Sequence, residues 1–197
     1  ANAILNNDIN EPVLEFAFQG PLLKVHNGNI VFCISGDVEF DIIESNGEIS
    51  KGFNYQIYSL KNGDQIDIKH TKNSIYGYLA IKNSFNFEKI WDSYSINTQA
   101  NIGPNDGKKF FLNQKIFLTK DIKEKLKIKQ LRYKNIRTKI IRVIKGTNFN
   151  YFSDQAIKNF FNSKFKITNS INRMGIRLEG LKLENITNTN IKSEGLV

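Results

Sequence analysis

The sequence predicts a mostly β protein, of the β-rich α+β class with few helices. Three observations predict it. Short apolar runs fill the N-terminal part of the chain and are separated by turn pairs, most clearly Asn27-Gly28, Asn46-Gly47 and Asn62-Gly63. Residues 65–69 alternate strictly between polar and apolar, which is typical of a strand with one face in water. Residues 153–163 are the one segment that combines a helix cap with helical periodicity.

The N-terminal half is expected to form a β-meander, barrel or sandwich. Each expected strand is rich in Val, Ile, Leu or Phe and ends at a turn signal such as Gly20-Pro21. The expected strands cover residues 14–18, 22–25, 30–34, 38–43, 53–60, 65–69 and 77–81.

The middle of the chain changes character. Residues 83–109 are rich in Ser, Asn, Asp and Gly, so we expect a long loop, a kind of segment that often carries function. A further strand is expected over residues 110–118. Residues 120–142 are dense in Lys and Arg with apolar residues interleaved, and their pattern does not select one secondary structure.

The C-terminal part contains the expected helix. Residues 140–144 alternate again, which favours a strand that ends before Gly146. Ser153 is a suitable N-cap for a helix through residue 163, because the apolar residues that follow share one face. Residues 165–197 return to short strands and turns.

Length and composition favour one domain over all 197 residues. The mean hydropathy is −0.38, and no uninterrupted apolar run reaches the roughly 20 residues of a membrane helix. The N-terminus lacks the basic and apolar regions of a secretion signal, and the lone Cys33 cannot form an intramolecular disulfide. We therefore expect a soluble protein in the reducing cytoplasm.

The formal net charge is +9, from 28 Lys and Arg against 19 Asp and Glu. The excess is mostly Lys scattered along the chain, which favours surface solvation over one binding face. Residues 120–142 could neutralise phosphates, but Tyr133 is their only stacking platform, so nucleic-acid binding is the less favoured interpretation.

Metal and triad chemistry are not expected. His26 and His70 are the only imidazoles, and both are expected to be solvated residues at strand ends. Cys33 lies in an apolar run and is expected in the core. The sequence contains no Walker loop and no Gly-x-Gly-x-x-Gly motif.

Residues 172–180, Asn-Arg-Met-Gly-Ile-Arg-Leu-Glu-Gly, are the best candidate for chemistry. They place Arg173 and Arg177 beside glycines in a chain that otherwise prefers lysine. Arginine is a permanently charged fork for carboxylate or phosphate, and glycine lets the backbone approach a ligand. From composition alone, an anion site and a hairpin with two surface arginines are equally supported.

This segment resembles the signature Ser-Asp/Asn-Arg-Met-Gly-x-Arg-Leu-x-Gly of the biotin-dependent carboxyltransferase-like family. Residues 193–195 likewise match its Ser-Glu-Gly. Further matches fall in the family's order along most of the chain: Ala1-Asn2, Leu14-Glu15-Phe16, Gly20-Pro21, Ser35-Gly36, Gly63-Asp64, Tyr78-Leu79-Ala80 and Ile141-Arg142-Val143. The family includes the C-type subunit of 5-oxoprolinase, allophanate hydrolase subunit 2, the Kip-type antagonists of a kinase inhibitor and part of the carboxyltransferase domain of urea carboxylase.

The chain also departs from the family pattern. Lys82-Asn83-Ser84 stands where the family usually has a Gly-Gly pair. The Gly-Ser-Arg-Ser-Thr loop appears as residues 92–96, Asp-Ser-Tyr-Ser-Ile, so Tyr94 replaces the loop arginine. The family's outermost N- and C-terminal motifs are not found. We therefore expect residues 1–197 to be a single carboxyltransferase-type domain that is incomplete at both ends.

The resemblance implies a cyclophilin-like β-barrel and a heteromeric enzyme. It implies partnership with a related B-type (subunit 1) protein and, for 5-oxoprolinase, a LamB-type subunit. ATP is implied at the level of the complex, and biotin only where a carboxylase partner exists. The implied substrate is a small amide, lactam or urea-type molecule, as in hydrolysis of 5-oxoproline to glutamate. The alternative is a non-catalytic regulatory protein of the Kip type that sequesters a partner.

The resemblance also implies site residues. Arg173 and Arg177 would hold a carboxylate or a developing oxyanion, and Glu194 would be the acid or base. The residues expected to contact substrate are Asn172, Met174, Gly175, Ser193, Gly195, Ser93 and Ser95.

Overall fold

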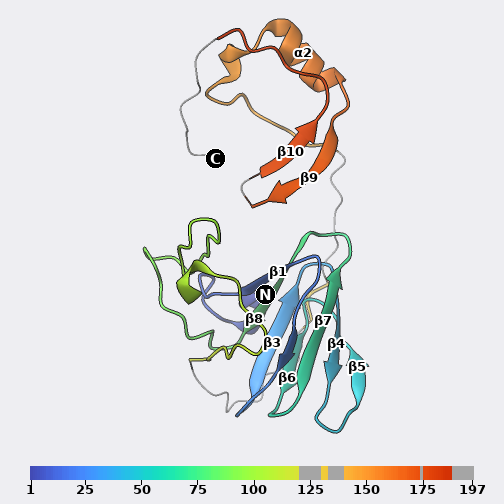
Figure 1. Cartoon of the computed structure of the whole chain (residues 1–197). Coiled ribbons are helices and arrows are strands. Elements are labelled where there is room, and N and C mark those ends of the chain that lie inside the picture. The colour runs from blue at the N-terminus through green and yellow to red at the C-terminus, as the bar shows by residue number, and fades with distance from the viewer. Residues whose placement is uncertain (120–129, 133–139, 174, 188–197) are drawn as a thin grey trace. The chain divides into compact units, whose positions relative to one another are not determined.

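The computed structural model describes residues 1–119, 130–132, 140–173 and 175–187. It divides the chain into two compact units, residues 1–135 and residues 136–197, which are coloured blue to yellow-green and orange to red in Figure 1. The expectation of one domain across the chain stays a prediction, and each unit is described by itself.

The first unit confirms the mostly β prediction. Its described residues contain eight strands, which form two antiparallel four-stranded sheets ordered β1-β8-β3-β6 and β2-β7-β4-β5 (Figure 1). The strands are β1 (Leu14–Ala17), β2 (Leu22–Lys24), β3 (Ile30–Ser35), β4 (Val38–Ile43), β5 (Ile49–Lys51), β6 (Ile57–Leu60), β7 (Gln65–Thr71) and β8 (Tyr76–Ile81). Each expected strand of this half has a counterpart, although the strand expected over residues 53–60 begins only at Ile57, and β5 is an addition.

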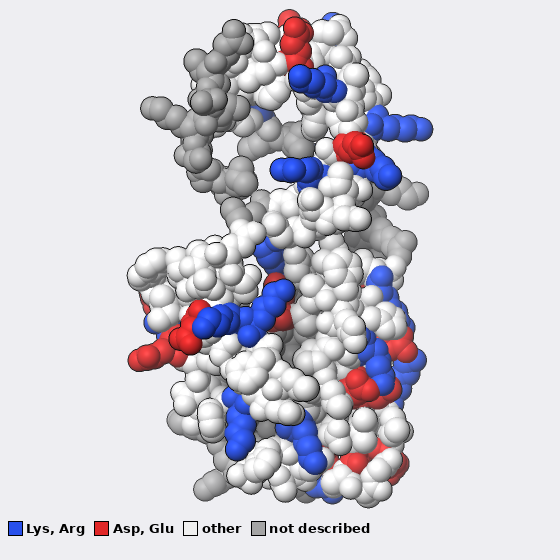
Figure 2. Space-filling view, in the orientation of Figure 1, with Lys and Arg blue, Asp and Glu red and all other residues white. Residues whose placement is uncertain are grey.

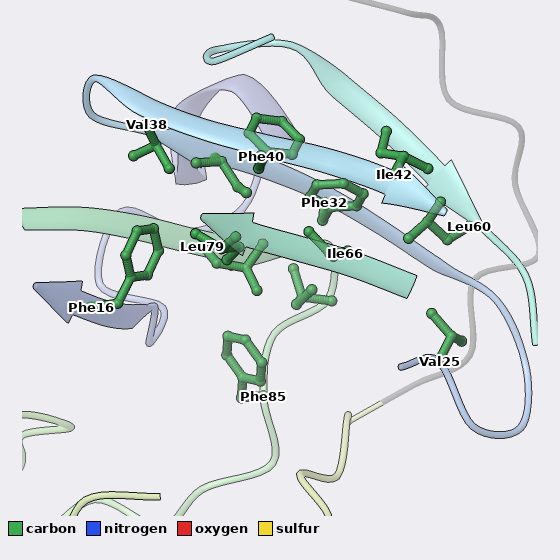
Figure 3. Close-up of a cluster of buried hydrophobic side chains, with 13 residues drawn as sticks. Phe16, Val25, Phe32, Val38, Phe40, Ile42, Leu60, Ile66, Leu79 and Phe85 are labelled. Carbon is green, nitrogen blue, oxygen red and sulfur yellow. The ribbon is translucent and has the colours of Figure 1, made fainter. Parts of the chain in front are cut away.

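One hydrophobic cluster joins the two sheets. Strand β4 alternates strictly, so Val38, Phe40 and Ile42 point into the cluster while the residues between them face outward. Residues from both sheets make up the cluster, as Figure 3 shows: Phe16, Val25, Phe32, Ile34, Val38, Phe40, Ile42, Leu60, Ile66, Ile68, Leu79, Ile81 and Phe85. Apolar burial on this scale is the dominant stabilising term of the unit.

The helix α1 (Asn2–Leu5) covers the other face of the first sheet and was not predicted. Leu5 is fully buried against Val31 and Cys33, which explains why β3 is apolar at successive positions instead of alternating. The Asn2 amide donates to the Glu11 carbonyl oxygen at 2.8 Å and accepts from Asn7 at 3.1 Å. The family's Ala1-Asn2 match therefore has a structural role, since it fixes this helix.

Asp64 fixes the turn between β6 and β7. Its buried carboxylate accepts hydrogen bonds from the backbone N–H of Ser45 at 2.9 Å and of Lys61 at 3.0 Å. Burial acts to raise the pKa of Asp64, but the hydrogen bonds from Lys61 and Ser45 outweigh it and hold the pKa below its ordinary value.

Asp64→Asn is expected to lower the free energy of unfolding by about 1–3 kcal/mol near pH 7, because the new NH₂ group would face a backbone donor. The difference from wild type should shrink as the pH falls below about 4. The stabilisation by a carboxylate with a lowered folded-state pKa is present above the unfolded-state pKa and is lost as the pH falls through the folded-state value. Urea unfolding at several pH values measures it, with exposed Glu88→Gln as the control. An equal difference at pH 7 and pH 2.5 would contradict this assignment.

Residues 83–109 form the predicted long loop, but the strand expected over residues 110–118 is wrong, and the loop continues to residue 119. That segment contributes only an isolated bridge between Phe85 and Leu118 among the described residues, and a single 3-10 turn, η1 (Asn105–Gly107), precedes it. Phe85 is buried, and its ring lies 6.1 Å from that of Phe87. Aromatic packing and two backbone hydrogen bonds, from the Asn86 N–H to the Phe117 carbonyl oxygen at 2.8 Å and from the Thr119 N–H to the Ser84 carbonyl oxygen at 3.3 Å, hold the loop in place of a continuous ladder.

The second unit contains the 3-10 turn η2 (Phe149–Tyr151), the helix α2 (Asp154–Asn162) and the hairpin of β9 (Lys166–Asn172) and β10 (Gly175–Glu179). The predicted helix and the predicted return to short strands are confirmed. The strand expected over residues 140–144 is wrong: Ile140, Ile141 and Ile144 are exposed and the segment has no ladder partner among the described residues. In none of the helices described are length and apolar character sufficient to cross a membrane.

Ser153 caps α2 as predicted, because its side-chain oxygen accepts a hydrogen bond from the Ala156 N–H at 3.1 Å. Ser153→Ala is expected to destabilise the helix by about 1 kcal/mol. Amide hydrogen exchange in the first turn of α2 measures the effect directly. Ser163→Ala, at the other end of the same helix, is the matched control and should leave those rates unchanged. Equal exchange rates in the two variants would show that the cap contributes nothing.

Candidate functional site

The segment singled out in the sequence forms the tip and second strand of the β9–β10 hairpin. Asn172 pairs with Gly175, so the chain reverses over two residues, the first of which is Arg173. The Asn172 side-chain oxygen accepts a hydrogen bond from the Gly175 N–H at 3.2 Å and closes the turn. A methyl group added to Gly175 would meet no atom within 4 Å, so a ligand could approach its backbone.

Arg177 lies at an irregularity of the same hairpin. The register shifts between Ile176 and Leu178, and the Thr168 hydroxyl donates to the Arg177 carbonyl oxygen at 3.0 Å across the shift. Bulges of this kind bend a strand and re-aim its side chains, and they are frequent beside active sites. The hairpin therefore has a defined local geometry around Arg177.

The hairpin is open to solvent. Every residue of β10 is exposed, including Ile176 at 51% and Leu178 at 49%. Arg177 forms no salt bridge among the described residues, so within that part of the chain its guanidinium is not neutralised. An arginine held on an ordered strand without a neutralising carboxylate can receive a carboxylate or an oxyanion from a ligand.

Ser93 and Ser95 lie in the loop of the first unit. The Ser93 hydroxyl oxygen accepts from the Ser95 N–H at 3.1 Å, and Ser93 pairs with Ile90 through two backbone hydrogen bonds. Lys89 lies 5.4 Å from the centre of the Tyr94 ring, so a cation sits beside the residue that replaces the family's loop arginine. A hydrogen bond to Asp92 raises the pKa of Lys89 and pairs that cation with a carboxylate.

The structure thus groups the predicted site residues by unit. Asn172, Arg173, Gly175 and Arg177 share one hairpin of the second unit, and Ser93 and Ser95 share one loop of the first. Met174, Ser193, Glu194 and Gly195 lie outside the described residues, as do most of the basic residues 120–142. Figure 2 shows Lys and Arg interspersed with Asp and Glu on the face it presents.

The histidines and the cysteine, which were not expected to take part in chemistry, lie in the expected environments. His26 and His70 are exposed, although His70 lies within β7 instead of after it. Cys33 is fully buried, and burial raises the pKa of its thiol to about 11, so it is protonated at neutral pH. No cluster of three His, Cys, Asp or Glu side chains suited to a metal ion occurs within the described ranges.

A family model for the carboxyltransferase domain, subdomain A and B, matches residues 1–197. The chain belongs to this carboxyltransferase-domain family. The resemblance carried by residues 172–180 is confirmed at the level of the family.

Two curated relatives illustrate the range of proteins that contain this carboxyltransferase domain. The chain is 26% identical over 195 residues to urea amidolyase of Saccharomyces cerevisiae, matching 92% of this chain and 10% of the yeast protein. It is 24% identical over 200 residues to the C-type subunit of 5-oxoprolinase from Escherichia coli, matching 100% of this chain and 62% of that relative. The chain therefore spans about three fifths of one relative and a tenth of the other.

Solved structures support the same fold for the carboxyltransferase domain. The crystal structure of Kluyveromyces lactis urea carboxylase superposes with a TM-score of 0.76 at 22% identity, over 95% of this chain and 17% of that one. At this identity the likeness establishes the fold alone.

The structure also shows a solvent-open hollow that the sequence did not reveal. A hollow of about 400 Å³ in the first unit is lined by residues from three separate segments: Gly36, Asp37, Phe53, Asn54, Tyr55, Gln130, Leu131 and Arg132. Ser35-Gly36 of the family pattern was the one signal in the sequence that touches it. Only folding brings residues 36, 54 and 132 together.

Proposed function

We propose that this chain is a subunit of an ATP-dependent enzyme complex that acts on a small amide, lactam or urea-type substrate. The favoured reaction is hydrolysis of 5-oxoproline to glutamate. The second candidate is a reaction like that of allophanate hydrolase or urea carboxylase. The observation that carries the proposal is the exposed β9–β10 hairpin, which bears Arg173 and Arg177 within the family signature.

The arginines would stabilise negative charge on the reacting carbonyl group. Attack on an amide or urea carbon moves charge onto its oxygen, and a fixed cation stabilises that charge more in the transition state than in the ground state. Asn172 and Gly175 would set the turn that presents Arg173. Glu194 would act as the acid or base. The backbone of Ser193 and Gly195 would supply hydrogen-bond donors. In the first unit, Ser93 and Ser95 stay predicted substrate contacts through their hydroxyl groups.

The hairpin also supports a partner subunit. Both its strands are largely exposed, and in the described part of residues 136–197 Ala156 is the one apolar residue with less than a tenth of its surface exposed. A two-stranded hairpin is marginal in water unless another surface covers an apolar face. A B-type (subunit 1) protein, with a LamB-type subunit in the 5-oxoprolinase case, would provide that surface. We place ATP in the complex, and biotin only in a complex with a carboxylase.

Co-purification tests the proposal against the regulatory alternative, in which a Kip-type protein sequesters its partner without chemistry. The Tyr94 replacement of the loop arginine is the observation that favours that alternative. The chain is co-expressed with a B-type subunit of 5-oxoprolinase, and the purified complex is supplied with ATP and 5-oxoproline. Glutamate production supports the enzyme. A stoichiometric complex that converts neither 5-oxoproline nor urea would replace it with the regulator.

A further inference from the structure

Three Asn-Gly pairs occur in the chain, and each lies in a connection between two strands of the first unit: Asn27-Gly28, Asn46-Gly47 and Asn62-Gly63. In such a pair the backbone nitrogen of glycine can attack the side-chain amide carbon of the preceding asparagine, because glycine has no Cβ to obstruct the approach. The attack needs the glycine N–H and the asparagine side chain to be free. The hydrogen bonds around the three pairs therefore decide which of them can react.

The Asn46-Gly47 pair is held at both reacting groups. The Gly47 N–H donates to the Glu44 carbonyl oxygen at 2.8 Å, so the attacking nitrogen is engaged in the turn. The Asn46 Oδ1 accepts a hydrogen bond from the Glu48 N–H at 2.9 Å, which fixes the side chain. Both bonds must open before the glycine nitrogen of this pair can reach the amide carbon.

The Asn62-Gly63 pair is held in the same way by other partners. The Gly63 N–H donates to the Val25 carbonyl oxygen at 3.0 Å. The Asn62 Oδ1 accepts a hydrogen bond from the Asn27 N–H at 2.8 Å. This pair is therefore also protected at its nitrogen and at its side chain.

The Asn27-Gly28 pair has neither restraint. Asn27 is exposed, and among the described residues its side chain and the Gly28 N–H have no hydrogen-bond partner. Asn27 is held through its own N–H, which donates to Asn62, and rotation about the Asn27 Cα–C bond leaves that hydrogen bond in place. The peptide between Asn27 and Gly28 is thus free to turn toward the Asn27 side chain.

We propose that Asn27 is a modification site that undergoes spontaneous deamidation, with water as the co-reactant. The Gly28 nitrogen attacks the Asn27 Cγ and a new C–N bond forms. The side-chain nitrogen leaves as ammonia with the proton of the Gly28 N–H, and a five-membered imide remains. Water then opens the imide at one of its two C–N bonds and leaves aspartate or isoaspartate at position 27.

The modification changes the connection between the two sheets. Residues 25–29 join β2 of the second sheet to β3 of the first. Either product replaces a neutral amide by a carboxylate, and isoaspartate also adds a methylene group to the backbone of this connection. The site is built from the first unit alone, so the proposal is independent of the hairpin arginines and of any partner subunit.

Peptide mass spectrometry after incubation of the purified chain above neutral pH tests the proposal. Trypsin releases residues 25–51, which contain both Asn27 and Asn46, and residues 62–69, which contain Asn62. Asn27 is expected to react about ten- to a hundredfold faster than the other two, because two hydrogen bonds must open before attack at each of those. The rate should rise with hydroxide concentration, since the deprotonated glycine nitrogen is the nucleophile.

Two controls separate the effect of the fold from that of the local sequence. In concentrated urea the turn hydrogen bonds are lost, so the three pairs should react at similar rates. Asn27→Gln should abolish the early mass gain of residues 25–51, because ring closure through a longer side chain is slow, while Asn46→Gln should leave it unchanged.

Equal rates at the three pairs of the folded chain, or a faster reaction at Asn46 or Asn62 than at Asn27, would overturn the proposal. An unmodified Asn27 over the time in which the pairs react in urea, or an early mass gain that survives in Asn27→Gln, would overturn it as well. None of these outcomes bears on the turnover test of Arg173.

Discussion

Replacing Phe32 with alanine is expected to lower the free energy of unfolding by about 3–5 kcal/mol. Phe32 is fully buried at the centre of the cluster shared by the two sheets (Figure 3). Its ring stacks on Tyr58 with centroids 5.4 Å apart and meets Phe40 edge to face at 6.3 Å. The substitution removes both contacts and leaves a cavity that the surrounding strands cannot fill.

Urea unfolding followed by near-UV circular dichroism measures this loss. Phe111→Ala is the matched control, because Phe111 is 71% exposed in the loop and should change the free energy of unfolding by less than about 0.5 kcal/mol. Equal destabilisation by the two variants would mean that Phe32 does not hold the shared core.

Arg173→Ala is expected to lower kcat of the reconstituted complex by about 100- to 1000-fold, the range for loss of one group that stabilises an oxyanion. Arg177→Ala is expected to have an effect of the same order if both cations contact the developing charge. Arg173→Lys retains the charge without the planar fork, so its activity should lie between those of wild type and Arg173→Ala.

Lys166→Ala is the control for the arginine variants, because Lys166 is an exposed cation of the same hairpin that pairs with Glu179 at its far end. Steady-state turnover of 5-oxoproline and of urea distinguishes the variants. Full turnover by Arg173→Ala would remove Arg173 from the mechanism, and an equal loss in Lys166→Ala would assign the effect to the hairpin's stability.

Local signals in the sequence were sufficient to predict much of the first unit. Residues 38–43 alternate because β4 has one face in the core, and Asn62-Gly63 supplies the turn that β7 needs. The missed α1 has four residues and no side-chain cap, so its stability comes from burial of Leu5, which local pattern does not encode. The strand predicted over residues 140–144 was wrong because the alternating pattern alone does not supply a partner strand, and none is described for this segment.

The hairpin of the candidate site could be predicted from the sequence for a different reason. Asn172, Arg173, Gly175 and Arg177 are close in the chain, so one motif reports all of them. The hollow lined by Gly36, Asn54 and Arg132 unites segments distant in sequence. Sites of the second kind become visible only in three dimensions.

The most direct test of the proposed function is 5-oxoproline-dependent ADP release by a mixture of the chain with a B-type protein of 5-oxoprolinase, measured beside the B-type protein alone. We predict ATP consumption that requires both proteins and 5-oxoproline and is matched by glutamate formation. ADP release that is the same with and without this chain, for 5-oxoproline and for urea, would contradict the assignment as a catalytic subunit.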